Sequence, residues 1–206
     1  FRPPSAGPYI WSDYELTQHR QRGDDIEKIK AEKLQATGVY YREMLKHVKH
    51  VLSDIKRVVP DYDEKQGYEL AGFVWFQGFN DLVSSWTYEK QNELGGYDLY
   101  RNLLVHLIHD VRKDLESPKL PVVIGVMGID GLTRINASMK HFREAQVAAA
   151  AQPEFQGNVI AVQTAPFWDD ELNALHQKRD QVNDKVRKQF DKDAGATREI
   201  QEEARR

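Results

Sequence analysis

Three short apolar stretches stand out from a chain that is otherwise rich in charged and polar residues. They are "AGFVWFQ" at residues 71–77, "PVVIGVMGI" at 121–129 and "NVIAVQTA" at 158–165. Each has the length of a strand, and an unbroken apolar run is typical of a strand covered on both faces, as in a parallel sheet. The pattern therefore predicts three buried strands.

Apolar residues at helical spacing occupy the segments between these strands. From Asp24 the pattern predicts one amphipathic helix that ends before Pro60, on a stripe made of Tyr41, Met44, Leu45, Val48, Val51, Leu52 and Ile55. Further helices are predicted at 97–115 and 134–151. Residues 1–23 contain three prolines and no periodicity, which predicts an irregular surface segment, whereas residues 166–206 predict a highly charged helical stretch.

The alternation of helices and strands predicts an α/β fold with a parallel sheet and helices on both faces. With 206 residues the chain is long enough for one sizeable domain. Three strands make a small sheet for such a domain. We therefore expect further strands, outside these residues, to complete it.

Composition narrows the choice of partners. The net charge is −3, and basic and acidic residues are interspersed, so nothing indicates a nucleic acid or an anionic membrane as partner. The chain contains no cysteine, which excludes disulfides, thiolate metal sites and a cysteine nucleophile. No apolar run reaches the roughly 18 residues of a membrane span.

Polar residues follow each predicted strand, at the edge of the sheet where α/β proteins bind small molecules. These residues are Gln77, Gly78, Asn80 and Asp81 after the first strand, Gly128, Asp130 and Gly131 after the second, and Gln163, Thr164, Trp168, Asp169 and Asp170 after the third. An Asn on a glycine-loosened turn can direct its side-chain N–H at a carbonyl oxygen that becomes an oxyanion. The alternative is that Asn80 and Asp81 cap a turn or a helix.

The stretch "FVWFQGFNDL" resembles the W-x-Q-G-x-[ND] block of the sialate O-acetylesterase-like carbohydrate esterases, within the SGNH/GDSL hydrolases. The stretches "FRPPSAGPY", "HVKHVLSDIKRVVPDYD" and "GYDLYRNLLVHLIHDVRKDL" resemble planctomycete-type members of that group. The resemblance implies a flavodoxin-like sheet and removal of O-acetyl groups from sugars through a serine acyl-enzyme. It also implies that Asn80 is an oxyanion-hole donor, that Gly78 frees the turn and that Gln77 lines the site.

Two features depart from the family pattern. Phe79 stands where many relatives have a Glu that orients the catalytic His. The family's Gly-x-Ser-Asn nucleophile turn and its C-terminal His block are not found between Phe1 and Arg206, so we expect this segment alone to be catalytically incomplete. The resemblance further implies an association with the remaining part of the same domain.

Other candidates have simpler explanations. Ser5, Ser84 and Ser85 lack the sequence context of a nucleophile, and His176 is expected to be a surface or packing residue. The pairs His47/His50 and His106/His109 are expected on helix surfaces, without a metal.

Trp75, Tyr97 and Tyr100 are expected to be core aromatics, so Trp86 and Trp168 are the aromatic candidates for substrate contact. Asp81 and Asp169 join them as candidate substrate ligands, although Asp169 also suits a helix N-cap.

The sequence thus predicts an acetylesterase acting on an acetylated carbohydrate, with no cofactor. A non-catalytic carbohydrate-binding or scaffold protein with the same fold is the alternative. A secreted or periplasmic location follows from the family's substrates only.

Overall fold

The computed structural model describes residues 2–133 and 135–203, with side chains through Lys192. The chain divides into two compact units. The first contains the described residues up to Met127 together with Asn136–Gln163, and the second contains the described residues of Gly128–Ile135 and those from Thr164 onwards. Each unit is described by itself.

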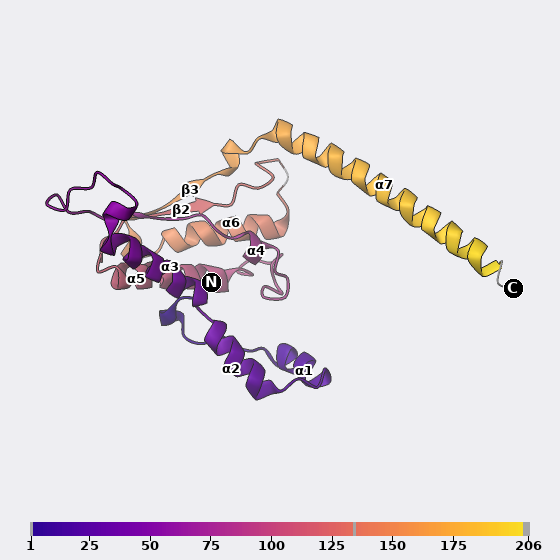
Figure 1. Cartoon of the computed structure of the whole chain (residues 1–206), viewed down its shortest axis with the longest axis horizontal. Helices are drawn as coiled ribbons and strands as arrows, with labels where there is room; N and C mark the ends of the chain where they lie inside the picture. Colours follow the sequence, from indigo (N-terminus) through magenta and orange to yellow (C-terminus); the bar gives the residue numbers. More distant parts are fainter. Residues whose placement is uncertain (1, 134, 204–206) are drawn as a thin grey trace. The chain divides into compact units, whose positions relative to one another are not determined.

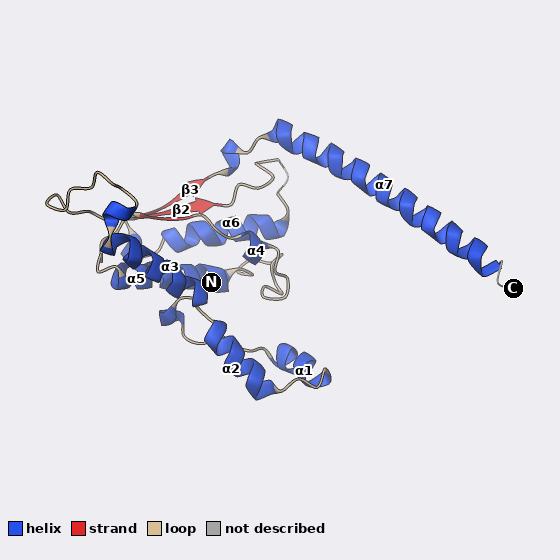
Figure 2. Ribbon diagram, in the orientation of Figure 1, coloured by secondary structure: helices blue, strands red, loops and turns tan. Residues whose placement is uncertain are grey.

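A three-stranded parallel sheet forms the centre of the first unit (Figure 2). Its strands are β1 (Phe73–Trp75), β2 (Val122–Val126) and β3 (Val159–Gln163), in the order β1-β2-β3. In the register, Val74 pairs with Val123, and Val123 pairs with Ile160. The predicted α/β class with a parallel sheet is confirmed, and each predicted strand is present with shorter bounds.

Two helices connect the strands, namely α5 (Asp98–Asp114) between β1 and β2 and α6 (Ala137–Ala150) between β2 and β3. Figure 1 shows both helices on the same side of the sheet. Their apolar stripes face it, and the fully buried core of this layer includes Tyr97, Tyr100, Leu104, Leu107, Ile108, Val111, Phe142, Val122, Ile124 and Val126. This core fixes the end of β1, where the polar residues gather.

The opposite face of the sheet carries exposed apolar side chains. Val74 is 68% exposed, Phe76 69%, Ile160 55% and Val162 40%. The unbroken apolar runs of the strands predict helices on both faces. In the part of the chain that the structure describes, α5 and α6 cover one face only.

The N-terminal region differs from expectation in two ways. Helix α1 (Asp13–Gln21) lies within the segment expected to be irregular, and its start is fixed by a capping box between Ser12 and Glu15. The single helix expected from Asp24 is divided into α2 (Ile26–Ala36) and α3 (Val39–Ser53). The division lies at Gly38, whose φ of 73° is left-handed and cannot continue a helix.

Short 3₁₀ turns complete the first unit: η1 (Pro4–Ala6), η2 (Ile55–Arg57) and η3 (Pro153–Phe155). The second unit contains η4 (Ala165–Phe167) and the charged helix α7 (Asp170–Glu203). None of the helices described here has the length and apolar character needed to cross a membrane.

Candidate active site

The turn after β1 is built on a glycine in close contact with the core. Gly78 is buried and forms the N-cap of the short helix α4 (Phe79–Leu82). A Cβ placed on Gly78 would lie 2.6 Å from Cε1 and Cζ of the fully buried Phe142. No larger residue fits this position, so the glycine is explained by packing as well as by the bend of the chain.

Asn80 projects from the first turn of α4 and is exposed. No side-chain hydrogen bond of Asn80 is present among the residues that the structure describes. An amide that only capped the turn would be bonded to nearby backbone. The Asn80 amide is therefore available to a ligand, as an oxyanion donor must be.

Asp81 lies one residue further and is held by two neighbours. Its Oδ2 accepts a hydrogen bond of 3.0 Å from Gln77 Nε2, and its Oδ1 accepts one of 2.8 Å from the Tyr88 hydroxyl. Gln77 Oε1 is buried and has no hydrogen-bond partner within the described ranges. Gln77 and Asp81 therefore bond to each other, and this contact helps to fix the turn. Contact of either side chain with substrate stays a prediction.

Two more tyrosines bind the backbone of the same turn. The Tyr100 hydroxyl donates to Gln77 O at 2.9 Å, and the Tyr97 hydroxyl donates to Leu82 O at 2.7 Å. Gln146 Nε2, from α6, also lies 3.4 Å from Gln77 O. With Tyr88, these two tyrosines form a set that we call the tyrosine clamp.

Burial keeps the hydroxyls of the clamp protonated. It raises the pKa of Tyr97 to about 12, and it raises the pKa of Tyr100 further. For Tyr88, burial and the nearby Asp81 carboxylate both raise the pKa. All three hydroxyls therefore remain hydrogen-bond donors at neutral and mildly alkaline pH.

The clamp was not found from the sequence, because Tyr97 and Tyr100 were expected to be core aromatics. Their rings lie in the core, and their hydroxyl groups donate hydrogen bonds to the turn. The signal available was their position: all three tyrosines lie in the 88–100 segment that directly follows the turn.

Two of the three candidate nucleophiles, Ser84 and Ser5, have other partners. Ser84 Oγ donates to Thr87 Oγ1 at 2.9 Å, which is a local turn contact. Ser5 Oγ lies 2.9 Å from Nδ1 of His106, and the Ser5 N–H donates to Asp110 Oδ2 at 2.9 Å. Because these two bonds attach η1 to α5, Ser5 serves as an anchor of the N-terminal segment.

Trp86 is half-exposed, and its indole N–H donates to Glu15 Oε1 at 3.2 Å. The ring packs against Tyr14 at a centroid distance of 5.3 Å. Partial burial acts to raise the pKa of Glu15, but hydrogen bonds from Tyr9, Ser12 and Trp86 hold it below its usual value. The indole edge is thus occupied, and substrate contact by the ring face stays a prediction.

Trp168, Asp169 and His176 belong to the second unit, so the structure does not join them to the turn after β1. Asp169 Oδ1 accepts a hydrogen bond of 2.8 Å from Leu172 N, which is the N-cap contact that was the alternative for this residue. Trp168 Nε1 is buried and has no partner within the described ranges. His176 is exposed on α7.

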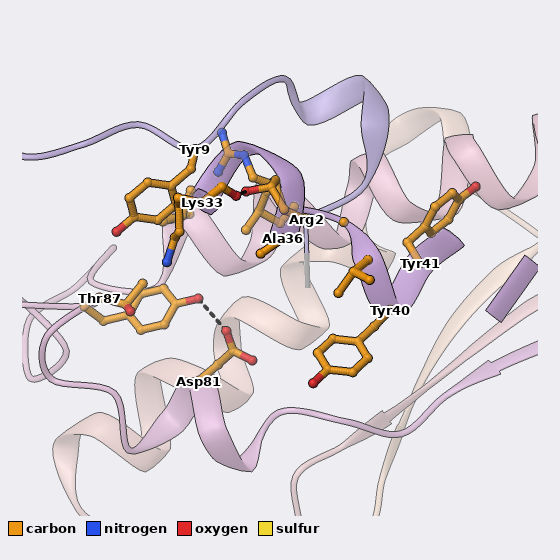
Figure 3. Close-up of a pocket in the computed structure, with 14 residues that line it drawn as sticks. Arg2, Tyr9, Lys33, Ala36, Tyr40, Tyr41, Asp81 and Thr87 are labelled. Atoms are coloured by element: carbon orange, nitrogen blue, oxygen red, sulfur yellow. Dashed lines mark hydrogen bonds between the residues drawn. The ribbon is translucent and has the colours of Figure 1, made fainter. Parts of the chain in front are cut away.

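A cavity of about 310 Å³ adjoins Asp81 in the first unit (Figure 3). Its walls come from the N-terminal segment, the α2–α3 corner, the 81–88 loop and α5. The sequence alone does not reveal this cavity, because its lining residues are distant in the chain. Among the side chains that the structure describes, no group of His, Asp or Glu could hold a metal.

A family model described as carbohydrate esterase, sialic acid-specific acetylesterase, matches residues 21–187. No curated protein and no solved structure matches the chain significantly. The matched residues include the three strands, the turn after β1 and the tyrosine clamp.

Proposed function

Because the chain belongs to the carbohydrate esterase family of sialic acid-specific acetylesterases, we propose that it contributes the oxyanion side of a serine esterase site. The substrate is a sugar carrying an O-acetyl group, and the family description indicates a sialic acid. Asn80 is the proposed oxyanion donor, and the tyrosine clamp positions the turn that carries it. A secreted or periplasmic location is proposed from the substrate class alone.

The proposed reaction is acyl transfer in two steps. A serine hydroxyl attacks the acetyl carbonyl, the sugar hydroxyl leaves, and water then releases acetate from the acetyl-enzyme. In both steps the carbonyl oxygen acquires negative charge. A side-chain N–H held at this oxygen stabilises the transition state more than the ground state.

A single observation supports this role most strongly. The Asn80 amide is exposed and unbonded within the described ranges, while the residues around it are fixed by hydrogen bonds. The backbone that carries the donor is thus held in place, which limits the reorganisation that would weaken electrostatic stabilisation.

The test is acetate release from O-acetylated N-acetylneuraminate by the full-length protein, with the serine and histidine that residues 1–206 are expected to lack, and by its Asn80→Ala variant. We expect kcat to fall by about 10²–10³-fold, as for the loss of one oxyanion donor. The free energy of unfolding should hardly change, because the side chain has no described partner. The matched control is Asn92→Ala, at an exposed position in the neighbouring loop. Equal kcat in the two variants would refute the role of Asn80.

The alternative is a carbohydrate-binding protein that keeps the fold without turnover. The pairing of Ser84 with Thr87 favours it, because this serine is engaged in a turn. Labelling of the full-length protein with a fluorophosphonate, which modifies activated serines, separates the two functions. An esterase is labelled and releases acetate, whereas a binding protein retains the sugar and stays unlabelled.

A further inference from the structure

The cavity beside Asp81 has the size and the walls of a small-molecule site. Its volume of about 310 Å³ lies at the lower end of the roughly 300–1,000 Å³ that such sites occupy. Figure 3 shows Arg2, Tyr9 and Lys33 on one side of it and Asp81 on the other. The cavity therefore has basic side chains on one side and, on the other, the carboxylate of Asp81, which follows Asn80 in the sequence.

The basic side holds two cations. Lys33 is exposed, with Nζ 4.2 Å from the centroid of the Tyr9 ring, and it has no acidic partner in the described part of the chain. Arg2 donates from Nε to Gly7 O at 2.9 Å and from Nη2 to Ala6 O at 3.0 Å. Both of these acceptors are neutral carbonyls, and no salt bridge joins Arg2 or Lys33 to an acid within the described ranges. An anionic ligand would provide the missing charge.

The remaining walls suit a sugar ring. Leu99 and Leu103 supply an apolar surface, whereas Tyr40, 83% exposed, and Thr87 supply hydroxyls. At the far side, the Asp81 carboxylate can accept a hydrogen bond from a sugar hydroxyl. A small apolar area with a few convergent polar groups is the usual composition of a ligand pocket.

We propose that this cavity binds a sugar ring that carries a carboxylate, with the carboxylate held by Lys33 and Arg2. The inference rests on the proposed function, because the adjacency of Asp81 and Asn80 would place the bound ring beside the ester. It also goes beyond the family match, which covers residues 21–187 and so excludes Arg2 and Tyr9. Lys33 and Arg2 are thus specificity residues rather than catalytic ones.

The experiment compares N-acetylneuraminate with its methyl ester, in which the carboxylate is blocked, by isothermal titration calorimetry on the whole chain. We expect the acid to bind about tenfold more tightly than the ester, as for a charge-assisted hydrogen bond. Lys33→Gln should abolish this difference. Lys28→Gln, a change of the same charge on α2 but outside the cavity, should preserve it. Equal affinity for the two probes, or no binding of either, overturns the proposal.

Two further results keep the test specific. If Lys33→Gln retains the preference for the acid, the carboxylate is bound elsewhere and the assignment to this cavity is wrong. Thermal unfolding by circular dichroism must show that the variant is folded; if it is not, Lys33→Arg, which keeps the charge, must retain the preference.

Neither probe carries an O-acetyl ester, so binding is measured without turnover. A full-length protein that binds the acid selectively but releases no acetate would refute the esterase and leave the pocket standing.

Discussion

At the scale of residues, the turn after β1 combines buried side chains that fix its backbone with one exposed amide. Tyr88, Tyr97 and Tyr100 are buried, and each donates one hydrogen bond to the turn. Asn80 lies in the same turn, is exposed and has no described partner. The buried donors hold the backbone, so the exposed amide can be reserved for a ligand.

Because of the tyrosine clamp, we expect the free energy of unfolding to decrease at alkaline pH. The folded pKa of each tyrosine is raised, whereas tyrosines of the unfolded chain titrate near pH 10. Above about pH 10 the unfolded state loses protons that the folded state keeps, so the free energy of unfolding falls as pH rises. The stabilisation is complete below that pH. Each tyrosine can contribute a slope of up to about 1.4 kcal/mol per pH unit.

Tyr100→Phe isolates one member of the clamp. The variant loses the bond to Gln77 O and is less stable at neutral pH by about 1–2 kcal/mol. Its stability should also decline less steeply above about pH 10, because one titrating hydroxyl is absent. Urea unfolding at about pH 8 and about pH 11 measures both effects. An unchanged slope would show that Tyr100 does not keep its proton in the folded state.

At the scale of elements, the hydrophobic pattern predicted the helices and strands whose apolar side chains pack in the core. The stripes of α5 and α6 and the three apolar strands were identified because their side chains face one core. The division between α2 and α3 was not identified, because it depends on the backbone angles of Thr37 and Gly38, which the apolar stripe at 41–55 does not reveal. Helix α1 was missed because its start depends on the capping box of Ser12 and Glu15 rather than on apolar residues.

Gly38 offers a test of this corner. A Cβ on it would lie 2.9 Å from Arg2 O and would occupy a residue with φ of 73°. Gly38→Ala should lower the free energy of unfolding by about 1–3 kcal/mol and weaken binding of the acidic sugar, because Arg2 must move. The control is Gly67→Ala, where φ is 68° and no atom lies within 4 Å. If both variants bind the sugar equally well, the contact with Arg2 is not needed for the pocket.

At the scale of the whole molecule, the two faces of the sheet have unequal surroundings. One face is buried under α5 and α6, whereas Val74, Phe76, Ile160 and Val162 are exposed on the other. Exposed apolar patches mark interaction surfaces or sites of aggregation. The sequence showed that these residues are apolar, but not which of them the described helices cover.

Replacing the exposed residues with threonine tests this asymmetry. The triple variant Val74→Thr, Ile160→Thr and Val162→Thr keeps β-branched side chains and should bind less of the dye ANS, with little change in the free energy of unfolding. Val159→Thr, on the buried face of β3, should instead destabilise the protein by about 1–3 kcal/mol. Equal destabilisation by the two variants would contradict the exposure of the first face.

The candidate site was only partly predictable for a related reason. Gln77, Gly78, Asn80 and Asp81 are neighbours in sequence, so a local motif could identify them. Arg2 and Lys33 meet Asp81 around one cavity only through the tertiary fold, and no spacing in the sequence encodes that meeting.

The tyrosine clamp has a consequence for a chain that has been cut. Leu94 is 88% exposed in the loop between Tyr88 and Tyr97, which makes this loop a natural point of cleavage for a protease. A single nick there would leave Tyr88 on the N-terminal fragment, together with the turn, and Tyr97 and Tyr100 on the C-terminal fragment. Tyr97 and Tyr100 would still donate their hydrogen bonds to that turn. The two fragments should therefore elute together on gel filtration and separate only in denaturant. The loop could therefore serve as a place to split the protein into two complementing halves.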